Sequence, residues 1–220
     1  MDRRALILLL PMCALAHDPI STKITWSREV SRLVFARCAS CHREGGSSFS
    51  LMTYRQARPW AVAIKDEVLS RRMPPWGAVE GFGEFRDDES LTETQMEIIA
   101  AWAEGGAPEG DPALLPAAPE TAKALPSPTG TELAVDGRLV LSSAVRLIAI
   151  RPRALAAGAS MQVIARKPDG SVEPLLWIYD YDPRFPRTYI YREPILLPAG
   201  TTMEIVGRPR GAAADALVGS

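Results

Sequence analysis

The residues best suited to chemistry lie together in the chain, at Cys38-Ala39-Ser40-Cys41-His42. The pattern C-x-x-C-H is typical of the attachment site of a c-type haem, where two thiols form thioether bonds and the adjacent imidazole binds the iron. On a helical turn, positions 38, 41 and 42 share one face, so the three side chains can reach one group together. The motif therefore predicts one covalent haem, held by Cys38 and Cys41, with His42 as an axial ligand of the iron.

The second axial position of the iron is predicted to be filled by a methionine, because the chain contains only two histidines. Ligation by histidine and methionine is typical of electron carriers and raises their potential. The methionines considered for this position are Met52, Met73 and Met96. Met73 is favoured, because Pro74 and Pro75 fix an extended segment directly after it. Met52 is the runner-up, an open or water-bound position is the third possibility, and Trp76 is predicted to pack against the porphyrin edge.

The first sixteen residues are predicted to form a secretory signal peptide. Two arginines precede an apolar run over residues 5–10, and Ala14-Leu15-Ala16 has the small residues typical of a cleavage site. The apolar run is too short to span a bilayer. We therefore expect cleavage after Ala16 and export to the periplasm. A lipoprotein anchored through Cys13 is the alternative, which the residues before that cysteine disfavour.

The composition excludes several classes of protein. The formal net charge of −1 gives no reason to expect nucleic acid or an anionic membrane surface as a partner. Once Cys13 leaves with the signal peptide, Cys38 and Cys41 are the only thiols, which excludes a disulfide scaffold. Two histidines are too few for a multi-histidine zinc or copper site within this chain. No transmembrane segment is expected after signal cleavage, and 220 residues suffice for two modest domains.

Helical signals dominate the first half of the chain. Apolar residues at helical spacing lead into the haem motif, and residues 53–72 form a second helical region. The clearest helix begins at Thr92-Glu93-Thr94-Gln95, which has the pattern of a capping box, and ends at Gly105-Gly106. Residues 107–130 are rich in proline and alanine, which is typical of a semi-stiff linker.

The pattern changes after the linker, where short β-rich runs alternate with turn signals such as Lys167-Pro168-Asp169-Gly170. Such a pattern predicts a small all-β domain of the sandwich type. The expected strands are 139–141, 144–150, 161–166, 175–179, 188–191 and 203–206.

Two sequence pieces, "RRMPPW" at residues 71–76 and "W-x-x-G-G-A-P-x-G" at residues 102–110, carry a family resemblance. With the haem motif, they make residues 24–111 resemble a small bacterial class I-type cytochrome c domain. The resemblance implies a fold of three or more helices around one haem. It also implies that Met73 is the second ligand of the iron.

The C-terminal part is similar, more weakly, to the β domain of copper type II ascorbate-dependent monooxygenases. The similarity rests on the order of the strands, the Pro-Asp-Gly hairpin and the "LPAGT" turn. Where that family's pattern would have a His-x-His copper pair, this chain has Arg151-Pro152-Arg153, and no histidine follows His42. A guanidinium stays protonated and does not coordinate copper. Neither copper nor monooxygenase activity is therefore expected, and the β domain is expected to be truncated.

The predicted fold class combines α and β domains: an N-terminal all-α cytochrome c domain, a Pro-rich linker and a small all-β sandwich-like domain. The predicted divisions are a signal peptide at 1–16, a cytochrome c domain at 17–111, a linker at 112–130, a β domain at 131–210 and a tail at 211–220. The predicted function is single-electron transfer in the periplasm, with a protein redox partner and a metal-free β domain for docking. A haem enzyme of peroxidase-like or gas-binding type, with a labile sixth ligand, and a non-redox β assembly module are the alternatives.

Overall fold

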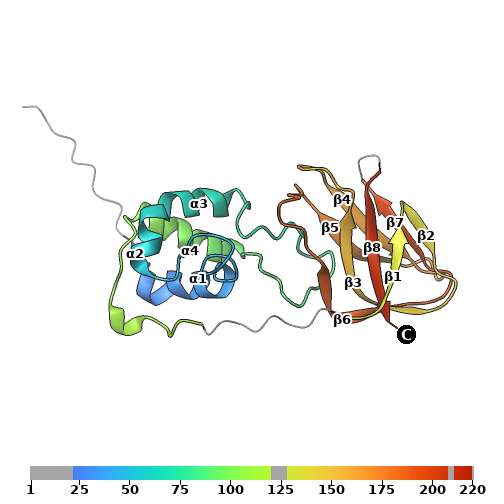
Figure 1. The fold of residues 1–220 in the computed structure, drawn as a ribbon, viewed down its shortest axis with the longest axis horizontal. Coiled ribbons are helices and arrows are strands. Elements are labelled where there is room, and N and C mark those ends of the chain that lie inside the picture. Colours follow the sequence, from blue (N-terminus) through green and yellow to red (C-terminus); the bar gives the residue numbers. More distant parts are fainter. Residues whose placement is uncertain (1–21, 120–127, 208–210, 220) are drawn as a thin grey trace, which may run out of the picture.

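The structure is a computed structural model that describes residues 22–119, 128–207 and 211–219. The predicted signal peptide, its cleavage site after Ala16 and the possible lipid-bearing Cys13 lie outside the described residues. Figure 1 shows a helical region, made of residues 22–72 and 91–119, beside a β region, made of residues 131–207 and 211–219. Residues 73–90, called here the bridging segment, run from the helical region to the β region and back (Figure 1).

The helical region is built from short helices around two buried tryptophans. Trp26 and Trp102 are almost completely buried, and their ring centroids lie 6.0 Å apart. Two capping boxes, at Thr53 and at Thr92, satisfy backbone N–H groups at the starts of α2 and α4. The capping box at Thr92 was predicted from the sequence. The elements are η1 (Trp26–Val30), α1 (Ser31–Arg37), α2 (Tyr54–Ala57), η2 (Arg58–Trp60), α3 (Ala61–Leu69), α4 (Glu93–Glu104) and η3 (Pro112–Leu114).

The β region consists of two four-stranded antiparallel sheets whose inner faces share one core. The strands are β1 (Thr131–Val135), β2 (Arg138–Val140), β3 (Val145–Arg153), β4 (Met161–Arg166), β5 (Val172–Ile178), β6 (Tyr189–Leu197), β7 (Thr202–Val206) and β8 (Ala213–Gly219). They are ordered β1-β8-β3-β6 in one sheet and β2-β7-β4-β5 in the other. Buried side chains alternate along β7, as expected for a strand with one face on a core.

The bridging segment pairs with the last strand of each sheet. On β5, the Val79 N–H donates to Trp177 O at 2.9 Å, and the Tyr179 N–H just beyond that strand donates to Gly77 O at 3.1 Å. On β6, the Arg86 N–H donates to Ile190 O at 2.8 Å and the Arg192 N–H donates to Glu84 O at 2.9 Å. These bonds satisfy backbone groups that a bare edge strand would leave open.

Side chains of the bridging segment also enter the core of the β region. Trp76 and Phe85 are 7% and 4% exposed, and both belong to the cluster formed by the two sheets. Gly83 lies so close to the sheet edge that a Cβ atom there would stand 2.6 Å from Leu175 O, and its φ is +87°. The segment is therefore part of the β region's packing, although it lies between two helices in the sequence.

The predicted fold class is wrong. The chain has no all-α N-terminal cytochrome c domain within the described residues, because the helices there are short and the longest, α4, has 12 residues. Eight strands in two antiparallel sheets make the described molecule mostly β. The error arose because residues 73–90 were counted with the helices, whereas they form an extended path held by β5 and β6.

The expected end of the β domain also needs correction. Residues 211–220 were predicted to be a tail, but Ala213–Gly219 form β8, which lies between β1 and β3 in its sheet. Residues 131–135, which were predicted to begin the domain but not to form a strand, make β1 and pair with β8. The expected strands 139–141, 144–150, 161–166, 175–179, 188–191 and 203–206 all overlap observed strands.

Replacing Phe85 with Ala should lower the free energy of unfolding of the β region by about 3–5 kcal/mol, because the ring is buried against Trp76, Tyr189 and Tyr191. Phe82 in the same segment is only half-buried and contacts Trp177, so Phe82→Ala should cost roughly 1 kcal/mol. Denaturant unfolding followed by circular dichroism measures both. Equal losses for the two variants would contradict the packing described above.

Candidate functional site

The residues of the C-x-x-C-H motif occupy one backbone turn at the end of α1. The Cys38 N–H still donates to Val34 O at 2.9 Å, so Cys38 caps the helix. The N–H groups of Cys41 and His42 then both donate to Cys38 O, at 3.2 and 2.8 Å. The turn keeps the two thiols and the imidazole at the short spacing that one shared ligand requires.

The imidazole of His42 is fixed by the loop that follows it. Its Nδ1 lies 2.9 Å from Phe49 O, and because a carbonyl only accepts, this contact places the ring proton on Nδ1. The lone pair is then on Nε2, which is free to bind a metal ion. An N–H to backbone carbonyl bond on the far side of the ring is the arrangement that orients most metal-bound histidines.

The loop returns closely past the motif, which requires a glycine. The Ser48 N–H donates to Cys41 O at 3.2 Å, and the Leu51 N–H donates to His42 O at 3.0 Å. A Cβ atom on Gly46 would stand 2.3 Å from Cys41 O, so any other residue there would push the loop away. The loop thus holds Phe49 O where His42 needs it.

The thiol of Cys38 is kept protonated. Burial raises the pKa of Cys38 to about 12, with smaller contributions from the negative charges of Glu89 and Cys41. Zinc sites and thiol–disulfide exchange both need a thiolate, and reactive C-x-x-C cysteines have lowered pKa values. The raised pKa of Cys38 is the opposite of the lowered pKa of a reactive dithiol, and no group of three or more His, Cys, Asp or Glu side chains that could hold a metal ion occurs among the described residues.

Arg37, next to Cys38, offers an unused cationic donor. Its guanidinium donates through one terminal nitrogen to Asp88 O, while its buried Nε has no hydrogen-bond partner among the described residues. A buried donor without a protein partner is costly unless a water molecule or a ligand oxygen accepts from it. A haem carries two propionates, so the residues present at the motif fit a haem.

Large apolar side chains are exposed near the motif. The Phe49 ring contacts the His42 ring edge to face at 5.0 Å, and it contacts the Trp60 ring at 4.8 Å. Phe49 and Trp60 are nevertheless 49% and 48% exposed. Val62 and Leu69 on α3 are exposed as well. Phe49 and Trp60 contact each other, so together they form an exposed apolar surface beside His42, of the kind that binds a ligand or a partner.

The three methionines considered as iron ligands have different surroundings. Met96 is buried on α4 in a cluster with Val68, Leu91 and Ile99, which makes it a core residue as expected. Met52 is half-buried and follows the Leu51 N–H that bonds to His42 O. Met73 is half-buried and begins the bridging segment directly after α3. Its N–H donates to Glu67 O at 3.2 Å, and its peptide bond to Pro74 is cis.

Trp76, which was predicted to pack against the porphyrin edge, lies in the core of the β region. Its ring packs against Phe85 and Tyr189 in the core of the β region, at centroid distances of 6.1 and 5.2 Å. Its carbonyl accepts a hydrogen bond from the Tyr189 hydroxyl. The residue thus attaches the bridging segment to the β region.

The contacts of Arg187 with the bridging segment were not predicted from the sequence. Arg187 lies just before β6; its Nε donates to Pro75 O at 3.1 Å, and its Nη2 pairs with Glu89. Its guanidinium also lies 5.5 Å from the centre of the Trp76 ring. More than a hundred residues separate Arg187 from Pro75 in the chain, and no local pattern marks such a contact.

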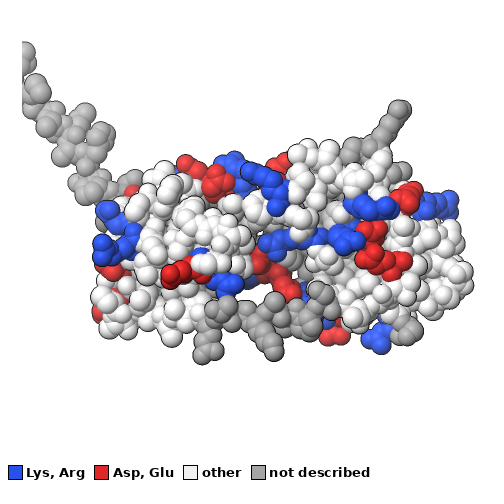
Figure 2. Space-filling model, in the orientation of Figure 1, with Lys and Arg blue, Asp and Glu red and all other residues white. Residues whose placement is uncertain are grey.

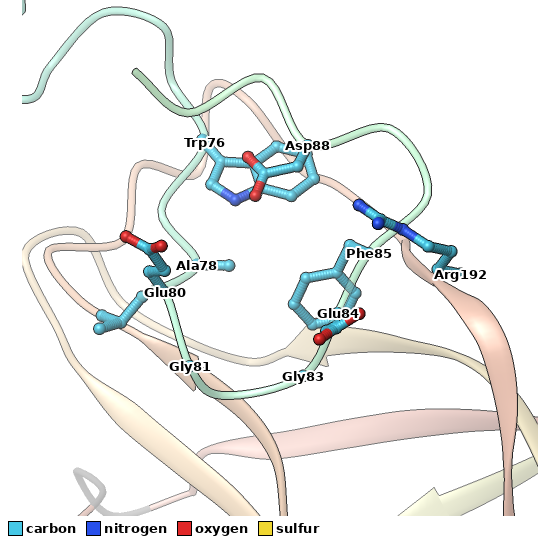
Figure 3. A pocket seen from close by; sticks show the side chains of 10 residues that line it. Trp76, Ala78, Glu80, Gly81, Gly83, Glu84, Phe85, Asp88 and Arg192 are labelled. Atoms are coloured by element: carbon cyan, nitrogen blue, oxygen red, sulfur yellow. The ribbon is translucent and has the colours of Figure 1, made fainter. Parts of the chain in front are cut away.

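A cavity of about 340 Å³ lies inside the bridging segment (Figure 3). Of the predicted haem-site residues, only Trp76 lines it, so the cavity is separate from the thiols and from His42. Its walls combine two aromatic rings with acidic groups and one arginine: Trp76, Ala78, Val79, Glu80, Gly81, Gly83, Glu84, Phe85, Asp88 and Arg192.

The arginines that stand where a copper pair was considered are engaged in ion pairs on β3. Arg151 and Arg153 both pair with Asp215, at 2.9 and 3.1 Å, and they also reach Glu132 and Asp136. Figure 2 shows basic and acidic side chains mixed over the visible face. Because these opposite charges neutralise one another, this surface has little net positive or negative potential with which to attract a strongly charged polymer.

No helix among the described residues is both long enough and apolar enough to cross a membrane. Comparison of the chain with protein-family models, with curated proteins and with solved structures finds no match. The resemblance to a cytochrome c domain and to a monooxygenase β domain therefore stays a prediction.

In haem-free protein, Cys38 should react with iodoacetamide about a thousandfold more slowly at pH 8 than after unfolding in urea, because raising the pKa from 9.0 to about 12 lowers the thiolate fraction by that factor. The folded rate should keep rising up to about pH 12. Glu89→Gln should speed the reaction, since it removes a negative charge that raises the pKa. Mass spectrometry of the labelled peptides gives the rates, and equal folded and unfolded rates would refute the raised pKa of Cys38.

Proposed function

We propose that this protein is an exported c-type haem protein that carries single electrons, with one haem attached at Cys38 and Cys41. The observation that carries the proposal is the Nδ1 contact of His42 to Phe49 O at 2.9 Å, within a C-x-x-C-H turn. This contact leaves Nε2 of the only histidine in the described residues free for iron. Export is supported by the signal-like pattern of the first sixteen residues.

Each residue of the motif has a separate task. Cys38 and Cys41 would hold the group through thioether bonds, and His42 would bind its iron. Arg37 would donate its buried, unpartnered Nε to a propionate. Phe49 and Trp60 would cover part of the porphyrin and lose their exposure to water. When bound, a haem supplies an iron that changes its charge by one electron.

Met73 is our proposal for the second iron ligand. It is half-buried, follows the end of α3, and is held on one side by its N–H bond to Glu67 O. A thioether ligand favours reversible electron transfer over ligand exchange, since it occupies the position that a substrate would need. No other histidine in the described residues could serve as a distal base, which disfavours a peroxidase-like reaction.

The β region is proposed to be metal-free and to dock the protein partner that exchanges electrons. Its charged side chains at β3 pair with one another: Arg151 with Asp215 and Glu132, and Arg153 with Asp215 and Asp136. Copper binds imidazole or soft sulfur, and guanidinium groups in ion pairs offer neither.

Met73→Ala should remove the methionine-to-iron charge-transfer band near the red edge of the visible spectrum. It should also lower the midpoint potential by on the order of a hundred millivolts or more, because the axial thioether raises the potential. Met52→Ala is the matched control and should retain both. The oxidised spectrum and a redox titration give the two quantities. A band that survives in Met73→Ala but disappears in Met52→Ala would move the ligand to Met52.

Metal analysis of protein purified after export should find about one iron and no stoichiometric copper per chain. Cys38→Ser should leave the haem attached through one thioether or not at all, as seen by haem staining of a denaturing gel and by intact mass. A doubly attached haem in that variant would refute the attachment site. Copper at one equivalent would overturn the proposal for the β region.

A further inference from the structure

We propose that Arg187 and Tyr189 of the β region are positioning residues for the iron ligand Met73. They hold the bridging segment directly after Met73 and so set how firmly the methionine stays on the iron. The proposal rests on the proposed function, because it takes Met73 as the ligand. It changes the role of the β region, which then takes part in the haem site rather than serving for docking alone.

Arg187 contacts the bridging segment at three points, two near the start of the segment and one near its end. Its Nε donates to Pro75 O at 3.1 Å, two residues after Met73. Its Nη2 pairs with the carboxylate of Glu89, near the other end of the segment. Its guanidinium lies 5.5 Å from the centre of the Trp76 ring, within the range of cation–π attraction. One side chain therefore ties the start of the segment to its end.

The Arg187–Glu89 pair is shielded from water, since the two side chains are only 24% and 22% exposed. An ion pair at this depth, with further hydrogen bonds on the arginine, loses more when one partner is removed than an exposed pair does. The pair therefore holds the two ends of the segment at a fixed separation.

Tyr189 holds the same stretch through Trp76. Its hydroxyl donates to Trp76 O, and its ring lies edge to face on the Trp76 ring at 5.2 Å. Burial raises the pKa of Tyr189, so the phenol stays a donor over the whole physiological range. Trp76 is three residues after Met73. Because Trp76 is held in place, Met73 can move only as far as the short stretch between them allows.

The far end of the segment reaches the haem motif itself. Asp88 O accepts from Arg37, which precedes Cys38. Glu89 is close enough to Cys38 for its charge to contribute to the raised pKa of the thiol. The segment that Arg187 closes thus starts at the proposed methionine ligand and ends beside the first cysteine of the motif.

A methionine leaves the iron more readily when its segment can move. An external ligand such as imidazole binds only the fraction of molecules in which methionine is off the iron, so its apparent affinity reports that fraction. Arg187→Gln removes the charge, the bond to Pro75 O and the pair with Glu89. Imidazole should then bind the ferric protein roughly tenfold more tightly than it binds the unmodified protein.

The experiment compares four variants of the full-length exported protein. Arg187→Gln and Tyr189→Phe should tighten imidazole binding, and Arg187→Lys should fall between Arg187→Gln and the unmodified protein, because lysine keeps the charge without the planar fork. Arg166→Gln is the matched control: Arg166 lies on β4 and pairs with Glu204 at 2.9 Å, also in the β region. It should leave imidazole affinity and midpoint potential unchanged.

A second measurement does not need the haem. Hydrogen exchange of the Val79 and Arg86 amides, which bond to Trp177 O and Ile190 O, should speed up in Arg187→Gln and Tyr189→Phe but not in Arg166→Gln. If the haem is present but imidazole affinity is unchanged in both site variants, the proposal is overturned and the proposed function stands. If no haem is attached to the unmodified protein, the proposed function fails, and the role for Met73 fails with it. Faster exchange would then still show that Arg187 and Tyr189 hold the segment, and unchanged exchange would refute that as well.

Discussion

The two sheets of the β region end in strands, β5 and β6, whose outer backbone groups need partners. The bridging segment supplies them: Val79 and Gly77 on the side of β5, and Glu84 and Arg86 on β6. An unpaired edge would invite association with other chains, so this pairing is part of what makes the sandwich viable in water. Because the segment connects α3 to α4, the same hydrogen bonds also attach the chain between these two helices to the β region (Figure 1).

The pairing makes the helical and β regions interdependent. Trp76 and Phe85 complete the core of the sandwich, while Arg37 and Asp88 connect the same segment to the helix that carries the cysteines. The core of the β region is therefore connected to the C-x-x-C-H motif by a continuous series of packed and hydrogen-bonded groups. The bridging segment is thus attached to the β region and to the helical region at the same time.

The sequence predicted what is determined by neighbours in the chain. The capping box at Thr92, the turn at Pro168-Asp169-Gly170 and most strands follow from local propensity, and the structure contains them. The bridging segment could not be predicted in this way, since its pairing depends on strands about a hundred residues away. Its Pro74-Pro75 was taken as a sign of a rigid loop, yet the apolar Trp76 and Phe85 fitted a helical domain equally well. At the candidate site, the spacing of the C-x-x-C-H motif was enough to select Cys38 and His42, whereas no sequence pattern marked Arg187.

The chemistry of Arg187 explains how the β region can hold a segment that begins at the proposed iron ligand. The guanidinium presents several donors in one plane, so a single side chain can bond a carbonyl and a carboxylate that lie on separate parts of a loop. Both acceptors, Pro75 O and Glu89, belong to the bridging segment. A lysine ammonium could supply the charge but not the fixed geometry. If Met73 is the iron ligand, Arg187 therefore supports it through the bond to Pro75 O, two residues further along the segment.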